Sequence, residues 1–422
     1  MSPLGLSLAY LRRRPLNTAL NLLLLAIGVG TIALLLLFSD QLKQRLDRDA
    51  KGIDMVVGAK GSPMQLILSS IFHVDIPTGN VSLGDARGLL SNPMVRAVIP
   101  LALGDSFRGY RIVGSEAAYP EHYQAELAAG AWWREPLEAT IGATVAAEGG
   151  LAIGDSFAGA HGMTSGGSAH GETPYRVVGV MARTGTVLDR LILTSIESVW
   201  DVHAVHGDEE EHAEEHHDDA AEIEDGAATS AQTGVLVSAD PDLEVTALLV
   251  KFRNPIAAAQ LPRQINMLTP MQAALPGYEI ARLMQLIGVG VDGFRAFAVV
   301  LVISAGLGIF TALYNALAQR RYDIAVMRAL GATRAAILRQ ILLEGVLLAT
   351  TGAVLGLALG HGIAEIAGGW LWREHQVHLV GLAWVAEETW LIVMAVALGA
   401  LAALLPALQA YRIDISKVLA RG

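Results

Sequence analysis

Four long, nearly uncharged apolar runs divide this chain of 422 residues. They cover residues 16–38, 296–318, 341–363 and 390–411. About 20 apolar residues in a helix cross a hydrocarbon core of roughly 30 Å. A segment in lipid must be helical because no water satisfies its backbone. The pattern therefore predicts four transmembrane helices, which we assign to residues 16–38, 291–318, 338–363 and 390–411.

Lys and Arg residues are concentrated before the first span, between the second and third spans, and after the fourth span. Arg12, Arg13 and Arg14 precede the first span, five arginines lie between the second and third, and a basic tail follows the fourth. Cytoplasmic loops carry the excess of such residues. We therefore expect a multi-pass protein of the bacterial inner (cytoplasmic) membrane with both termini in the cytoplasm. The first run is too long for a signal peptide, and no small-residue cleavage site follows Phe38, so we interpret it as a retained anchor.

This topology assigns each remaining segment to one side of the membrane. The predicted cytoplasmic segments are an elbow helix (1–15), a helix between the second and third spans (319–335) and a tail (412–422). The predicted outer segments are a large extracytoplasmic (periplasmic) domain (39–290) and a loop (364–389). Within the large domain, residues 40–51 and 278–292 are expected to continue the membrane helices outward as stalks.

The large outer domain has the pattern of an α+β fold. Segments rich in Val, Ile and Leu, bounded by Gly, Pro or Asp, predict strands at 95–103, 107–114, 175–182, 191–194, 234–238 and 245–252. Helices are predicted at 82–90, capped by Ser82, and at 256–267, after Asn254 and Pro255. The length fits one large domain or two lobes. Residues 57–62 are interpreted as a tight turn, and Trp132 and Trp133 as core residues.

The composition is typical of a membrane protein and excludes cysteine-based sites. Hydrophobic residues make up 53% of the chain and charged residues 17%, more apolar than an ordinary soluble domain. The chain has no cysteine, which excludes disulfides and thiolate metal sites. The net charge of −11 arises from residues 201–225, which contain twelve acidic residues and no Lys or Arg. We expect no nucleic-acid partner, and no nucleophile, base and acid can be assembled into a catalytic site.

A loop at 203–231 combines histidines with these acidic residues. The candidate metal ligands are His203, His206, His212, His216 and His217, with His161 and His170 in a second Gly/Ser-rich loop. Imidazole and carboxylate suit zinc and related divalent ions. The same composition is typical of a solvated low-complexity loop. Both interpretations stay open.

The segment 319–335 predicts an amphipathic helix with Ile324, Met327 and Leu330 on its apolar side. Such a helix could rest on lipid headgroups, or it could couple the membrane helices to a nucleotide-hydrolysing partner. No Gly-x-x-x-x-Gly-Lys-Ser/Thr motif occurs in the chain.

Three stretches resemble the FtsX/MacB-type permeases of ABC transporters, the type VII or mechanotransmission class. They are residues 320–333 with Arg-Ala-Leu-Gly-Ala at 328–332, the ending at 405–419, and an outer pattern that includes Gly130, Gly142, Gly154 and Asp155. The resemblance implies a homodimer that binds a dimer of cytoplasmic ATPases, with ATP and Mg²⁺ held by those partner chains. It also implies that the coupling residues are Asp323, Ile324, Ala325, Met327, Arg328, Ala329, Leu330 and Gly331.

Small and charged residues in the third span suggest further roles. Gly352, Gly356 and Gly360 share one helix face and permit close helix packing, either within the chain or at a dimer seam. Glu344 in the same helix needs a partner, and we expect a neighbouring Arg at the inner interface. Asp292 and Arg295 are expected to pair at the start of the second span.

The sequence thus predicts a permease subunit, not an enzyme. It would transmit ATP-driven motion to its outer domain for export, release or extraction of a periplasmic or membrane substrate. Two alternatives are a zinc or divalent-metal handling complex that uses the histidine loop, and an ATP-gated regulator of a periplasmic enzyme. Besides the ATPase, a second copy and lipid, a periplasmic substrate-binding or accessory protein could be a partner. This chain needs no cofactor of its own, apart from zinc if the loop binds it.

Overall fold

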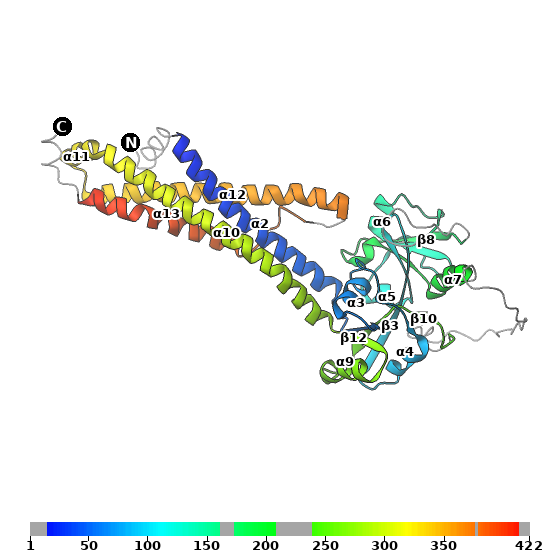
Figure 1. The fold of residues 1–422 in the computed structure, drawn as a ribbon. Coiled ribbons are helices and arrows are strands. Elements are labelled where there is room, and N and C mark those ends of the chain that lie inside the picture. The colour runs from blue at the N-terminus through cyan, green and yellow to red at the C-terminus, as the bar shows by residue number, and fades with distance from the viewer. Residues whose placement is uncertain (1–14, 161–172, 208–238, 376–378, 413–422) are drawn as a thin grey trace, which may run out of the picture. The chain divides into compact units, whose positions relative to one another are not determined.

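The computed structural model describes residues 15–160, 173–207, 239–375 and 379–412 (Figure 1). The chain divides into two compact units. One comprises Met1–Gln44 with Gln285–Gly422, and the other comprises Arg45–Met284. Among these residues, four helices are long and apolar enough to cross a membrane, and a sheet-rich α+β unit is inserted between the first and second of them. The predicted fold class is confirmed.

The helical unit is built from α2, α10, α12 and α13, which run alongside one another in Figure 1. Their bounds are Pro15–Asp49, Pro276–Gln319, Arg334–His375 and Glu388–Tyr411, with the short helix α11 (Arg321–Ala329) between α10 and α12. The polar segments after the first run and before the second are helical, so α2 and α10 each continue unbroken from one unit into the other.

Helix α12 is longer than the apolar pattern predicted. It ends at His375, inside the segment expected to be the outer loop 364–389. Gly368 lies inside this helix, and a Cβ at this position would overlap the carbonyl oxygen of Leu379. The glycine therefore allows the loop that follows to fold back against α12, a tertiary contact that periodicity alone does not reveal.

Small side chains dominate the core of the helical unit. Ala33, Ala305, Ala349 and Ala403 are fully buried. A Cβ on Gly345 would lie 2.6 Å from the carbonyl oxygen of Gly399. In a bilayer the lipid is as apolar as leucine, so close backbone approach, rather than the hydrophobic effect, drives such packing.

The α+β unit contains one ten-stranded sheet among the described residues. Its order is β12-β1-β11-β3-β4-β9-β6-β8-β5, with β7 paired to β8, and β2 and β10 form a separate pair. The strands are β1 (Met55–Ala59), β2 (Val81–Ser82), β3 (Val95–Phe107), β4 (Tyr110–Ser115), β5 (Leu127–Gly130), β6 (Glu138–Ile141), β7 (Ser156–Phe157), β8 (Tyr175–Met181), β9 (Leu191–Thr194), β10 (Glu244–Val245), β11 (Ala247–Phe252) and β12 (Met271–Ala274). The pairs β4–β9 and β6–β8 are parallel, and the other pairs are antiparallel.

Helices cover this sheet and divide its core into two clusters. The helices are α3 (Pro63–Ser70), α4 (Leu83–Leu90), α5 (Ala118–His122), α6 (Ala143–Glu148), η1 (Val187–Arg190), α7 (Ile196–Gly207) and α9 (Ile256–Leu268). One cluster centres on Met55, Leu248 and Leu261, and the other on Ile112, Ile141 and Tyr175. Helix α7 contributes Val199 to the first and Val202 to the second. The described part of the outer domain thus has one large sheet that is shared by two core clusters.

Several predicted elements are confirmed. Strand β9 has the predicted bounds 191–194. The Ser82 hydroxyl accepts a hydrogen bond from the Asp85 backbone N–H (3.2 Å) and caps α4, and Asn254 Oδ1 accepts from the Ala257 N–H (3.1 Å) at the start of α9. The predicted strand 234–238 lies outside the described residues.

Other predictions differ from the structure. Residues 57–59, expected in a turn, belong to the buried strand β1, where Gly58 leaves room for the Leu66 side chain. The strand expected at 107–114 is interrupted because Arg108 and Gly109 form a turn with positive φ (50° and 85°). Trp132 and Trp133 are half-buried rather than core residues, and their rings pack edge to face with centroids 5.8 Å apart.

Candidate functional site

Helix α11 and the turn after it form the first candidate site. Gly331 adopts φ = 104°, a left-handed conformation that glycine favours. The Ala332 N–H donates to the Met327 carbonyl (3.0 Å) and the Gly331 N–H to the Arg328 carbonyl (3.1 Å), the two bonds of a Schellman cap. Thr333 Oγ1 then accepts from the Ala336 N–H (3.2 Å) at the start of α12. Residues 330–333 are therefore two helix caps in succession.

The two faces of α11 have different surroundings. Ile324 and Ala325 are buried, and Ile324 packs in a cluster with residues of α10, α12 and α13, which are Leu317, Ile337, Ile341, Ala407 and Ala410. Met327 is partly buried against the same cluster. Asp323 and Ala329 are exposed, Tyr322 is 53% exposed and Leu330 is 83% exposed. Leu330 was expected on the apolar side of the helix but lies at its tip, because the Schellman cap turns the chain there.

An ion pair holds the junction between α10 and α11. Arg320 Nη1 lies 3.2 Å from Glu344 Oε2 on α12, and Glu344 is buried. This confirms the expected arginine partner of Glu344. The pair links the residue that precedes α11 to α12, and removing one member would leave an uncompensated buried charge. The exposed pair of Asp292 and Arg295 (3.0 Å) is also confirmed.

The three glycines of α12 face α2 of the same chain. A Cβ on Gly352 would lie 2.7 Å from a Leu25 side-chain atom, on Gly356 2.8 Å from the Ala26 carbonyl oxygen, and on Gly360 2.7 Å from the Gly30 carbonyl oxygen. This face of α12 is therefore covered by α2.

The end of α2 is fastened within the α+β unit. Asp49 is buried, and its Oδ1 accepts from the Val187 N–H (3.0 Å). The Tyr123 hydroxyl donates to the Asp49 carbonyl (2.7 Å), and Arg48 donates to the Gly185 carbonyl (3.0 Å). These bonds tie the last turn of α2 to α5 and to the segment that precedes β9.

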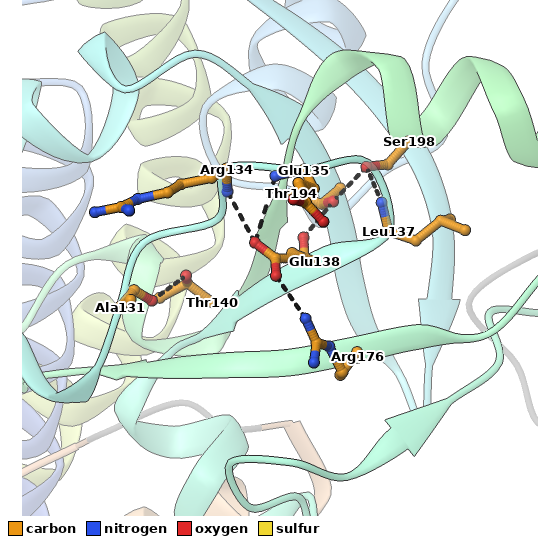
Figure 2. A network of polar contacts seen from close by, with 9 residues as sticks. All are labelled: Ala131, Arg134, Glu135, Leu137, Glu138, Thr140, Arg176, Thr194 and Ser198. Atoms are coloured by element: carbon orange, nitrogen blue, oxygen red, sulfur yellow. Dashed lines mark hydrogen bonds and ion pairs between the residues drawn. The ribbon is translucent and has the colours of Figure 1, made fainter.

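A polar network supports the loop that carries Trp132 and Trp133 (Figure 2). Glu138 Oε2 accepts from the backbone N–H groups of Arg134 (3.0 Å) and Glu135 (3.4 Å), and Oε1 from Arg176 Nη2 (2.8 Å). Ser198 Oγ accepts from the Leu137 N–H (2.8 Å). The Arg134 N–H, then the Glu135 N–H and Arg176, lower the pKa of Glu138, because each stabilises its ionised form.

The outer motif residues have local backbone roles. A Cβ on Gly130 would overlap the Val178 carbonyl oxygen, and one on Gly142 would overlap that of Asp189. Gly154 has φ = 95°, and Asp155 Oδ2 accepts from the Ala152 N–H (2.8 Å). The motif therefore serves strand and turn geometry in the sheet.

The side chains of all seven histidine candidates lie outside the described part of the structure, so the metal site stays a prediction. His161, His170, His212, His216 and His217 lie outside the described residues. His203 and His206 lie on α7, but their side chains are not among those described. Among the side chains that are described, no group of three or more His, Cys, Asp or Glu could hold a metal ion.

Sequence reasoning missed a polar cluster at the far end of α12. His361 lies 3.1 Å from Glu388 on α13, and Gln41 on α2 exchanges two hydrogen bonds of 2.8 Å with the Val380 backbone. The signal was a single histidine within an apolar run, which gives no indication of its partners.

Comparison with known proteins agrees with this architecture. Residues 18–266, more than half of the chain, match the family model of the MacB-like periplasmic core domain. Residues 295–415 match that of the FtsX-like permease C-terminal region.

Curated relatives match a shorter region. The macrolide export ATP-binding/permease protein MacB of Shewanella oneidensis is 31% identical over 129 residues, which is 30% of this chain and 18% of the relative. The protein of the same name from Nitrobacter winogradskyi is 32% identical over 127 residues, 30% of this chain and 19% of the relative. The match thus spans less than a fifth of each relative. Together with the four apolar helices and the inserted α+β domain, the family models show that the chain belongs to the FtsX/MacB-type permeases of ABC transporters.

Proposed function

We propose that this permease transmits ATP-driven movement from a separate cytoplasmic ATPase, bound at α11, to its extracytoplasmic α+β domain. The observation that carries the proposal is that α11 has one buried face and one exposed face. Ile324 and Ala325 bury one face against the helix bundle. Tyr322, Asp323 and Leu330 remain exposed. An exposed aromatic and an exposed leucine on a firmly held helix suit the groove of a partner protein.

The attachment of α11 supports transmission rather than simple docking. The Arg320–Glu344 pair and the two successive helix caps join α11 to α10 and α12 with little freedom at the joints. A push on α11 would therefore tilt both helices together. Helix α10 and helix α2 continue without a break into the α+β unit, and Asp49 fastens α2 there. Continuous helices convey displacement over their whole length.

We propose that ATP hydrolysis, with its Mg²⁺, takes place in a partner ATPase, in keeping with the permease family models that the chain matches. The curated relatives carry "ATP-binding" in their name. From this name we infer only that this permease works in an ATP-driven process. We further propose a homodimer in which each copy engages one ATPase. The cargo would be exported, released or extracted on the outer side.

Single-cysteine variants test the proposal cleanly because the chain has no cysteine. Leu330→Cys probes the tip of α11, and the matched control Leu382→Cys lies in the loop after α12, where the side chain is 87% exposed. In intact cells, a membrane-impermeant maleimide should label Leu382→Cys but not Leu330→Cys. In membranes that contain the cognate ATPase, a short cross-linker should join only Leu330→Cys to it.

Labelling of Leu330→Cys from outside the cell would contradict the proposed topology. Equal cross-linking of both variants, or of neither, would contradict docking at α11. Tyr322→Ala adds a functional readout. Loss of an anchor residue costs about 2 kcal/mol or more at an interface, so ATPase stimulation by the variant should need at least tenfold more permease.

A further inference from the structure

One face of α10 is exposed along the whole part of this helix that belongs to the helical unit. Its residues recur at alternating intervals of four and three. We call them the α10 stripe, and all are exposed: Leu286, Gly290, Gly293, Phe297, Val300, Ser304, Leu307, Thr311, Tyr314 and Ala318. An interval that averages 3.5 residues is the repeat by which one helix packs along another. The stripe therefore has the pattern of a helix-packing face, but no described element of the chain covers it.

The α10 stripe is longer than the hydrocarbon core of a bilayer is thick. Leu286 and Ala318 are 32 residues apart, which is about 48 Å along the helix axis. The hydrocarbon core measures roughly 30 Å, and even a tilt of about 40° leaves about 37 Å between the two ends. Because Arg320 and Arg321 follow directly at the predicted cytoplasmic end, the excess length lies at the outer end.

The ion pair of Asp292 and Arg295 marks this outer boundary. The two side chains are 70% and 45% exposed and lie 3.0 Å apart, and charged groups are costly in hydrocarbon. Leu286 of the stripe and its neighbour Val289 precede this pair, so they lie on its water side. They are 64% and 73% exposed. Such an apolar helix face in water indicates an interaction site.

Small residues of the stripe leave room for a second backbone. A Cβ on Gly290 or Gly293 would meet nothing within 4 Å, although glycine weakens the interior of a helix. The hydroxyls of Ser304 and Thr311 donate to carbonyls of α10 itself (2.8 Å each), so these residues also present a low profile. Small residues of this kind let another membrane helix approach closely.

The occupant of the stripe must suit both water and lipid. Lipid can cover only the part below the ion pair, and a soluble protein can cover only the part above it. A helix that runs beside α10 covers both. The other glycine-rich faces of the bundle are already packed within the chain, since Gly356 meets α2 and Gly345 meets Gly399 of α13. A second copy, inserted with the same topology, offers the same stripe at the same depth.

We propose that the α10 stripe is the seam of the homodimer, where α10 of one copy packs in parallel along α10 of the other. A two-fold axis along the membrane normal brings identical residues of the two stripes together. The inference rests on the homodimer proposed above and names the surface that forms it. In this arrangement the two copies meet along the outer part of α10 as well as within the membrane.

Disulfide scanning tests the seam, since the chain has no cysteine of its own. Single-cysteine variants of the full-length permease are expressed with the cognate ATPase, and isolated membranes are oxidised with copper phenanthroline. Leu286→Cys, Phe297→Cys and Val300→Cys should each yield a covalent permease dimer. Phe294→Cys and Val299→Cys are exposed on other faces of α10 and should yield none.

The matched control on another helix is Val354→Cys of α12. Val354 is 53% exposed and Val300 is 58% exposed, and each lies 20 residues from an arginine at the inner end, Arg334 or Arg320. The control should not cross-link. A dimeric mass of the purified complex without cross-links from the stripe would overturn the α10 seam and leave the homodimer standing. A mass with one permease copy would overturn both.

Gly293→Leu gives a second decision. Because its Cβ meets nothing in the single chain, the variant should fold, but the leucine would hold the two backbones apart. The dimer fraction of the permease, measured by mass photometry, should fall. Gly362→Leu on α12, where a Cβ also meets nothing within 4 Å, should keep the wild-type fraction. Equal dimer fractions in the two variants would also overturn the seam, whereas docking of the ATPase at α11 is decided separately by Leu330→Cys.

Discussion

At the scale of single residues, this protein uses carboxylates to organise backbone. Glu138 accepts from two consecutive backbone N–H groups and from Arg176. It thereby closes the loop that carries Trp132 and Trp133. Asp155 closes a turn on the Ala152 N–H in a similar way. In both cases a carboxylate accepts hydrogen bonds from backbone N–H groups of an irregular loop, which has no neighbouring strand to supply acceptors.

Glu138→Gln should destabilise the α+β unit above pH 5 by about 1 kcal/mol, typical of a lost capping interaction. The folded pKa of Glu138 is lowered, so its contribution to stability is present above the unfolded value of about 4.3. It is lost as the pH falls through the folded pKa. Denaturant unfolding of the full chain across this pH range measures the effect.

The control for this variant is Glu135→Gln, whose side chain is exposed. It should leave the pH dependence of stability unchanged. If Glu138→Gln shows the same acid dependence as wild type, Glu138 does not hold the loop through its charge.

At the scale of elements, close approach between α2 and α12 organises the membrane bundle. Gly30 and Gly356 let the two backbones meet, since a Cβ on Gly30 would lie 2.8 Å from the Gly356 carbonyl oxygen. Val29 and Ala353 are buried beside this contact. The packing uses backbone atoms, which cannot move aside as a flexible side chain can.

Gly356→Ala should therefore lower the thermal midpoint of the detergent-solubilised or nanodisc protein. Its Cβ would lie 2.8 Å from both the Ala26 carbonyl oxygen and Val29 Cβ, and overpacking of this kind costs typically 1–3 kcal/mol. Gly362→Ala on the same helix is the matched control, since a Cβ there meets nothing within 4 Å. The control should be neutral or slightly stabilising because alanine is the better helix former. Equal effects of the two substitutions would mean that the α2–α12 contact does not limit stability.

At the scale of the whole molecule, the α+β unit and the helical unit are connected through two unbroken helices, α2 and α10. The acidic histidine loop is attached to the sheet unit between α7, which ends at Gly207, and β10, which begins at Glu244. Helix α7 is fixed by Ile196, Val199 and Val202 in the two core clusters. The folded elements on both sides therefore have their own packing.

Deletion of residues 208–219 should leave the unfolding midpoint of the protein unchanged, because no described core residue is removed. Thermal unfolding checks this, and a fall in the midpoint would show that the loop supports the sheet. Growth of the deletion strain under zinc starvation and zinc excess then decides the metal hypothesis. Unchanged growth in both conditions would remove a metal-handling function from consideration.

The sequence by itself determined the membrane helices, the α+β character of the insertion and the family motifs. These depend on local quantities: apolar run length, strand composition, and cap residues such as Ser82 and Asn254. Only the tertiary structure decided which groups meet. It decided that Gly356 faces α2, that Leu330 is exposed, that β1 runs where a turn was expected, and that His361 reaches Glu388. These contacts join residues far apart in the chain. Hydrophobic periodicity predicts which face of a helix is buried, but it does not predict which element packs against that face.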